Sequence, residues 1–181
     1  MPEVKGITVS PGAPDTPREA DEDAVYRFLE NRGIAFLRAD HAPANTMEDC
    51  VAIEKALETH VPKNLWLCNR QKTDFYLLVM PADKPFHTKD ITAPLGCSRL
   101  SFASEEPLWE YLHIRPGAVS PLGLIHDTGK HVRLVLDRDL LAYDTLAFHP
   151  CRNHATVRVT QEDFTSRVLP ALGHEATWIT F

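Results

Sequence analysis

The sequence predicts a mixed α/β fold, in which helices surround a mixed β-sheet, and three observations support this prediction. Two runs, 63–68 and 75–80, are nearly continuous in apolar residues, which is typical of strands covered on both faces. The polar turn 69–74 joins these two runs as in a hairpin. Helical periodicity recurs between other strand-like runs, so hairpin links alternate with helical crossovers and indicate a mixed sheet that can curl.

The N-terminal part of the chain is predicted to hold an arm, two helices and one strand. Residues 1–18 contain four prolines and two glycines, so we expect an extended N-terminal arm ahead of a single domain at 19–181. Apolar residues recur at helical spacing over 19–32 and Gly33 follows as a stop signal, with a short strand expected at 34–38. A second helix is expected from Thr46 to about Glu58, because Thr46 and Asp49 resemble a capping box.

Strand and helix patterns alternate through the rest of the chain. Beyond the hairpin we expect a short helical turn at 88–95, a strand at 98–103 and a helix at 104–112. The remaining predictions are strands at 131–136, 145–149, 155–160 and 176–181, and a helix from Thr160 to about Gly173.

Length and composition indicate an ordinary globular protein. With 181 residues, 44% of them hydrophobic and 24% charged, the chain is long enough for one domain with a substantial core. No apolar run has the length of a membrane span and the N-terminus lacks a signal pattern, so we expect a cytoplasmic protein without a membrane partner. The cysteines form no CxxC pair and are expected to be reduced and packed: Cys50, Cys68, Cys97 and Cys151.

The net charge limits the nucleic acids that the protein could bind. Nineteen basic and 25 acidic residues give a formal charge of −6. Sequence-independent binders of DNA or RNA depend on many phosphate contacts, so the charge argues against that class and against a DNA partner. A protein that holds only one end of an RNA stays compatible with it, because a local basic patch can coexist with a negative total.

Three short pieces of sequence carry the functional argument. The segment Gly117–Pro121 lies between a helix pattern and a strand pattern, and its glycine and small residues leave backbone N–H and C=O groups accessible to a ligand. Lys63-Asn64 opens a strand, where a lysine is either an ordinary surface residue or a phosphate-binding charge at the rim of a cleft. Phe148-His149 ends another strand, where a histidine is usually structural. Each piece alone is also compatible with a purely structural role.

Together the three pieces resemble the YbaK-like, prolyl-tRNA-synthetase-associated family of aminoacyl-tRNA deacylases, and most of all its free-standing alanyl-tRNA(Pro) deacylase branch. The resemblance covers about residues 18–181. It implies a curved, barrel-like mixed sheet flanked by helices. It also implies hydrolysis of mischarged Ala-tRNA(Pro) without a metal or an organic cofactor. The implied partners are the acceptor end of tRNA(Pro) and, since few phosphate contacts mean modest affinity, prolyl-tRNA synthetase.

The resemblance also implies roles for individual residues. Lys63, Gly117 and His149 match catalytic positions: the lysine holds the terminal adenosine, the loop backbone positions the aminoacyl group, and the histidine forms a wall of the amino-acid pocket. A free 2′-hydroxyl of the terminal adenosine helps to activate water. We reject Ser120 as a nucleophile, because no Gly-x-Ser-x-Gly pattern surrounds it. The matching substrate-binding positions are Asn64, Ala118, Val119, Ser120, Pro121 and Phe148, of which the last is either a pocket or a core residue.

Three alternative functions stay open at this point. One is the same chemistry on another misacylated tRNA, such as Cys-tRNA(Pro). The second is a nucleic-acid-binding module without catalysis. The third is a metal-dependent hydrolase of a small metabolite, but the pairs His126/His131 and His149/His154 lack the spacing of a zinc site, so we expect no metal.

Overall fold

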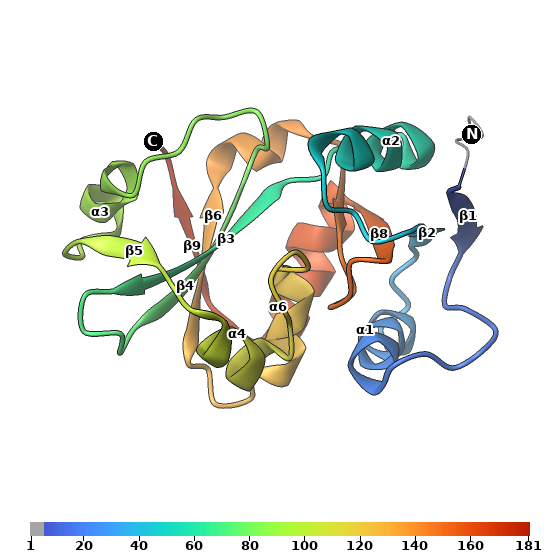
Figure 1. Cartoon of the computed structure of the whole chain (residues 1–181), viewed down its shortest axis with the longest axis horizontal. Helices are drawn as coiled ribbons and strands as arrows, with labels where there is room; N and C mark the ends of the chain where they lie inside the picture. The colour runs from blue at the N-terminus through green and yellow to red at the C-terminus, as the bar shows by residue number, and fades with distance from the viewer. Residues whose placement is uncertain (1–5) are drawn as a thin grey trace.

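In a computed structural model of the chain, which describes residues 6–181, the strands form two sheets that lie side by side (Figure 1). One sheet is mixed, because β4 pairs in parallel with β6 and antiparallel with β3. Its strands, in spatial order, are β5 (Leu100–Phe102), β3 (Lys63–Asn69), β4 (Phe75–Met80), β6 (Val132–Asp137) and β9 (Ala176–Ile179). The other sheet is antiparallel and contains β1 (Thr8–Pro11), β2 (Leu37–Asp40), β8 (Ala155–Thr160) and β7 (Thr145–Phe148).

The predicted mixed α/β class is confirmed, but the barrel-like sheet is wrong. The strands are divided between two sheets and neither closes. Within residues 6–181 a single bridge joins the sheets, where His60 lies parallel to Leu146 and the N–H of Ala147 donates to the His60 carbonyl at 3.1 Å. In a parallel ladder the next donor from this side would be residue 62, which is Pro62 and has no N–H. The ladder therefore stops after one bridge.

The four-stranded sheet has a helix on each face. Apolar residues of α1 (Ala20–Asn31) pack with those of β7 and β8 in the main core, which the two sheets share. The helix α2 (Met47–Leu57) covers the opposite face, where Ile53 and Leu57 contact the cluster around Ala147. The predicted capping box is present, since the Thr46 hydroxyl accepts from the Asp49 N–H at 3.1 Å and the Asp49 carboxylate accepts from the Thr46 N–H at 2.9 Å.

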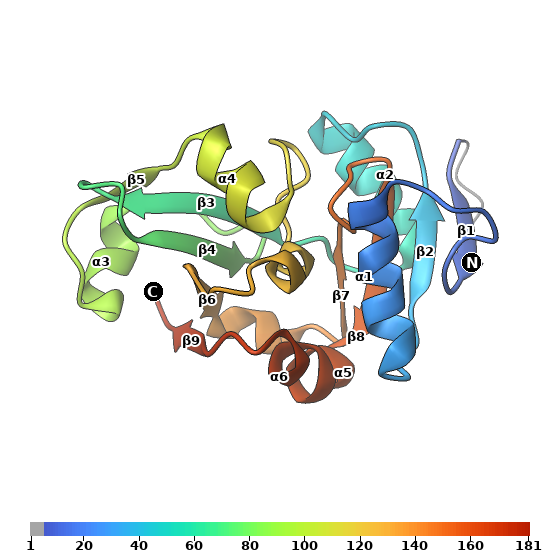
Figure 2. The same cartoon turned by 90° about the horizontal axis from the view of Figure 1, so that it is seen from below.

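The five-stranded sheet is also covered on both faces. The helix α3 (Lys89–Leu95) contributes Ile91 to a second cluster on one face. Figure 2 shows α4 (Glu105–Leu112) and the C-terminal helices over the other face, where they complete the main core. The helical segments on this face are α4, the 3₁₀ helix η1 (Pro121–His126), α5 (Gln161–Asp163), the π-helical turn η3 (Phe164–Val168) and α6 (Leu169–Leu172).

Some local predictions need correction. The strand expected at 34–38 begins at Leu37, because its register is fixed by pairing with β1 and β8. The 3₁₀ segments η1 and η2 (Arg138–Ala142) were not predicted. Of the cysteines expected to be packed, Cys50 and Cys97 are only half-buried. The predicted arm contributes β1 to the sheet, while residues 1–5 lie outside the described residues, so its separation from a domain at 19–181 stays a prediction. No helix within residues 6–181 is long and apolar enough to cross a membrane.

Candidate functional site between the two sheets

The segment Gly117–Pro121 connects α4 to η1 and has a fixed, turned backbone. Gly117 has a φ angle of 93°, in the region that side chains disfavour. Ser120 is fully buried, and its hydroxyl oxygen accepts from the N–H of Leu122 at 3.1 Å, while Pro121 is the first residue of η1. The Ser120 hydroxyl therefore caps this helix, which agrees with the rejection of a nucleophilic role.

A cavity of about 200 Å³ lies between this loop and β3. It is lined by Asn64 and Trp66 of β3, by Phe102, and by Gly117 and Val119 of the loop, among others. The Asn64 amide nitrogen donates to the Pro62 carbonyl at 3.2 Å, and this bond fixes the orientation of the amide. The Asn64 side-chain oxygen is shielded from solvent and has no partner among the described residues. An acceptor isolated in this way is costly, so a donor that reached it would be stabilised.

A second cavity, of about 330 Å³, lies on the other side of the same loop. Ala118 lines it together with Trp109, Arg115, Arg152 and Asn153. The Arg115 guanidinium lies 4.4 Å from the centre of the Trp109 ring, and this arginine has no acidic partner within residues 6–181. The Trp109 ring is also stacked on His113, so the group that this cavity offers to a ligand is the unneutralised charge of Arg115.

Lys63 does not line either cavity. Side chains alternate across a strand, so Asn64 shares its face of β3 with Trp66, whereas Lys63 shares the opposite face with Leu67. The Lys63 ammonium donates instead to the backbone carbonyl of Lys84. The structure thus places Asn64 next to the loop. The Lys63 side chain lies on the opposite face of the sheet.

His149 lies just past the end of β7 and is held by the backbone. Its Nδ1 lies 2.7 Å from the Ala155 carbonyl oxygen, so this nitrogen carries the proton and Nε2 keeps a lone pair. Burial lowers the pKa of His149, against the opposing effect of that hydrogen bond, and keeps the ring neutral. Phe148 points to the other face, where its ring centre lies 5.1 Å from that of Phe164 in the core. The structure therefore places Phe148 in the core.

The backbones that carry the three predicted pieces approach one another where the sheets meet, although neither Lys63 nor His149 lines the two cavities beside the loop. The bridge between His60 and Leu146 aligns the chain that enters β3 with the strand that ends at His149. The turn between β7 and β8 also reaches the loop, since Arg152 donates to the His113 carbonyl at 3.1 Å. Figure 2 shows the segment after α4 beside this turn, between the two sheets. A larger cavity of about 460 Å³, between β5 and α4, contains none of the predicted site residues.

The structure also reveals polar groups that the sequence analysis missed. Glu22 is fully buried in α1 and its carboxylate accepts from Tyr26 at 2.6 Å and from His154 at 2.8 Å. The spacing of Glu22 and Tyr26 is a local signal, but the contact with His154 joins distant segments that spacing cannot reveal. The sequence analysis considered His126 together with His131. In the structure His126 lies instead against His113, with ring centres 4.4 Å apart.

Comparisons with known proteins identify relatives over most of the chain. The model of the aminoacyl-tRNA editing domain matches residues 41–166. The prolyl-tRNA editing protein ProX of Acetoanaerobium sticklandii is 33% identical over 84% of this chain and 93% of its own. A prolyl-tRNA synthetase associated domain-containing protein 1 of Danio rerio is 31% identical over 98% of this chain and 96% of its own. A solved structure described as a candidate trans-editing enzyme for prolyl tRNA synthetase shares the fold, with a TM-score of 0.64 and 20% identity over 89% of this chain and 97% of that one.

Proposed function

Since the chain belongs to the aminoacyl-tRNA editing-domain family, we propose that it is a deacylase that hydrolyses mischarged Ala-tRNA(Pro) to alanine and free tRNA(Pro). The observation that supports this best is the cavity between Asn64 and the loop Gly117–Pro121, which lies inside the matched residues. A relative named as a prolyl-tRNA editing protein supports tRNA(Pro) as the nucleic acid.

The reaction breaks the ester between the amino acid and the terminal ribose of the tRNA. Water adds to the ester carbonyl, and the tetrahedral intermediate carries a negative oxygen that requires fixed N–H donors. We assign this task to the N–H groups of Gly117 and Val119, since the Ala118 N–H already donates to the Arg115 carbonyl at 3.2 Å. The turn at Gly117 and the buried cap at Ser120 fix the geometry of this backbone. The 2′-hydroxyl of the terminal adenosine helps to activate the water, so no side-chain nucleophile is needed.

The polar side chains position the substrate. The Asn64 oxygen without a partner accepts from the ammonium group of the aminoacyl moiety. Lys63, whose ammonium has donors beyond the one bound to the Lys84 carbonyl, holds the terminal adenosine from the edge of the sheet. His149 offers its Nε2 lone pair as a wall of the amino-acid pocket. Phe148 is buried in the core and supports the neighbouring His149. Pro121 starts η1 and so fixes the end of the loop.

A small pocket suits the editing of an error that a synthetase cannot avoid. A site built for proline loses only about 1–3 kcal/mol of binding when the smaller alanine occupies it, so it excludes alanine poorly. A second site that admits alanine and excludes proline corrects the error in a separate protein. The cavity of about 200 Å³ at Asn64 is compatible with such a size filter.

The direct test is a deacylation assay with tRNA(Pro) charged with alanine, cysteine, serine or proline. We expect rapid hydrolysis of the alanyl ester, slower hydrolysis of the cysteinyl and seryl esters, and none of the prolyl ester above the rate without protein. A preference for the cysteinyl ester would move the protein to another editing specificity. Binding of all four tRNAs without cleavage would refute the deacylase assignment.

A further inference from the structure

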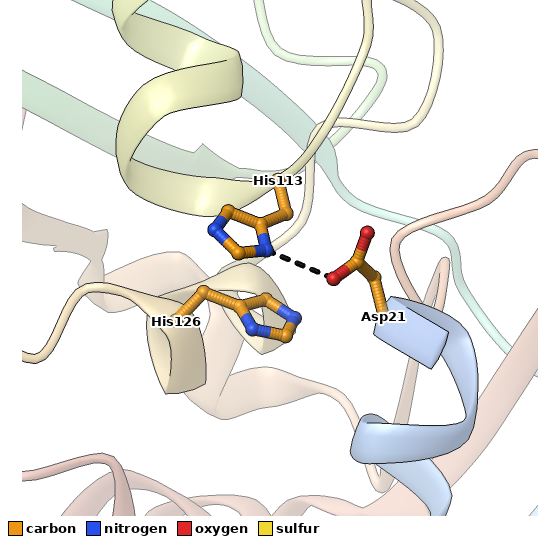
Figure 3. Close-up of side chains that lie close together, drawn as sticks. All are labelled: Asp21, His113 and His126. Atoms are coloured by element: carbon orange, nitrogen blue, oxygen red, sulfur yellow. Dashed lines mark hydrogen bonds and ion pairs between the residues drawn. The ribbon is translucent and has the colours of Figure 1, made fainter. Parts of the chain in front are cut away.

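Three side chains from distant parts of the sequence converge beside the loop (Figure 3). They are Asp21 in the first turn of α1, His113 at the C-cap of α4 and His126 at the end of η1. One potential ligand atom from each lies within 4.8 Å of the others. We propose that these residues form a binding site for a divalent transition metal ion of the zinc class.

The set of donors suits that class of metal. Two imidazole nitrogens and one carboxylate oxygen are ligands that zinc and its neighbours accept, and three protein ligands leave a coordination position for water. Magnesium and calcium prefer oxygen ligands only, so two histidines select against them. None of the three side chains is fully buried.

His126 is the residue that most needs a partner. Its Nε2 is shielded from solvent and has no hydrogen-bond partner within residues 6–181. Its ring is stacked against that of His113, with planes 9° apart. A neutral imidazole can offer the lone pair of this nitrogen to a metal ion. A buried lone pair without a donor is costly, and a cation at this position removes the cost.

Hydrogen bonds from neighbouring side chains already orient the Asp21 carboxylate, as such bonds do for carboxylates that bind a metal ion. One of its oxygens accepts from His113 Nδ1 at 2.8 Å, and the other accepts from Arg152 at 3.0 Å. The charge of Arg152 is shared with Glu19, whose carboxylate lies 2.6 Å away. The metal replaces the proton between His113 and Asp21, and that proton moves to the other ring nitrogen of His113.

The site would hold the loop at both ends. His113 lies four residues before Gly117, and His126 lies five residues after Pro121. His113 also has a φ angle of 55°, an uncommon conformation for a residue with a side chain, and this conformation ends α4. A metal bound here therefore ties the start and the end of the loop to α1.

Metal binding can be measured without tRNA, so its outcome is independent of the deacylase proposal. We suggest titrating chelator-treated protein with Co²⁺ and with Zn²⁺, and following calorimetry and the visible absorption of cobalt. The variants are His126→Ala and Asp21→Asn, with His87→Ala as a control because its side chain is 69% exposed and lies outside the cluster. Circular dichroism checks that each variant is folded.

The expected result is saturation at one metal ion per chain for the unmodified protein and for His87→Ala. His126→Ala and Asp21→Asn should bind at least about tenfold more weakly, and added Zn²⁺ should raise the melting temperature of the unmodified protein but not of His126→Ala. The proposal is overturned if the unmodified protein does not bind one equivalent, or if folded His126→Ala binds with unchanged affinity.

Discussion

At the scale of single residues, a substitution at Asn64 is expected to change activity much more than stability. Its side-chain oxygen is buried without a donor, so the folded protein gains little from it. We predict that Asn64→Ala changes the free energy of unfolding by less than about 1 kcal/mol, because the loss of its hydrogen bond to the Pro62 carbonyl is offset by the removal of an unsatisfied acceptor. The same change should lower kcat/KM for Ala-tRNA(Pro) about tenfold, since a hydrogen bond to the charged ammonium is lost.

Denaturant titrations and single-turnover deacylation measure the two effects of Asn64→Ala separately. A stable variant with unchanged kcat/KM would remove Asn64 from the substrate site. A large loss of stability would instead show that the oxygen has a partner in solution.

Lys63 tests whether the site lies where the loop meets the start of β3. We predict that Lys63→Ala lowers deacylation by about 100-fold, the effect expected when a charge-assisted contact to the substrate is removed, while the fold stays intact. The control is Lys72→Ala, since Lys72 lines the larger cavity of about 460 Å³ near β5. If the control loses activity and Lys63→Ala does not, the active site belongs to that larger cavity.

His149 gives a prediction about pH. Its pKa is lowered from 6.5 by burial, so the folded protein keeps the ring neutral as the pH falls through 6.5, while the unfolded chain takes up a proton. Its contribution to stability is therefore complete above pH 6.5 and is lost below it. We expect kcat/KM to fall only below this pH, and His149→Ala to lower activity or to reduce the preference for alanyl over prolyl esters. Rates of both esters between pH 5 and 8 provide the test, and a variant with an identical profile would exclude His149 from the pocket.

At the scale of elements, the loop depends on the backbone of Gly117. An added Cβ would have room, since Asn153 Nδ2 would be 3.6 Å from it, but the φ angle of 93° is unfavourable for alanine. We predict that Gly117→Ala costs about 1–2 kcal/mol of stability and reduces deacylation strongly, because the turn presents the N–H donors. Gly96→Ala is a matched control: Gly96 ends α3 at a φ angle of 61°, with open space around it and far from the site.

Both glycine variants should lose similar stability in denaturant titrations, and only Gly117→Ala should lose activity. Equal activity of the two variants at a temperature where both are folded would mean that the loop backbone does not take part in the reaction.

Local signals explain which elements the sequence predicted. The capping box at Thr46 and the hairpin of β3 and β4 depend on neighbouring residues, and both are confirmed. The start of β2 depends on its pairing with β1 and β8. The pairing between the two sheets ends after the bridge at His60, because Pro62 has no N–H to continue it. In the site, the resemblance predicted one pocket formed by the loop, Lys63-Asn64 and His149. Asn64 and the loop line one cavity, whereas Lys63 and His149 line neither of the two cavities beside the loop. The cluster of Asp21, His113 and His126 joins segments up to 105 positions apart, which no spacing rule covers.

At the scale of the whole molecule, the site lies at the junction of two sheets that share one core. The loop after α4 and β3 of the five-stranded sheet line the cavity at Asn64. The loop and the turn after β7 of the four-stranded sheet line the second cavity. Because the main core continues across this junction, changes in the packing of either sheet would move one wall of the site relative to the other. The single bridge at His60 is the only strand pairing between the sheets among the described residues.

The net charge of −6 makes the binding of tRNA a problem for the whole molecule. Long-range repulsion of phosphates must be overcome by a few local cations, and Arg115 is well placed because it lies beside the loop with its guanidinium over Trp109. We predict that Arg115→Gln raises KM for Ala-tRNA(Pro) several-fold with little change in kcat. It should also reduce the slope of log KM against log salt concentration by about 1, the effect of one lost phosphate contact.

Arg99→Gln is the control, because it removes the same charge from an exposed position outside both cavities. If both variants behave alike, the change reflects net charge alone; if only Arg115→Gln changes the slope, the acceptor end passes over Trp109 on its way to the loop.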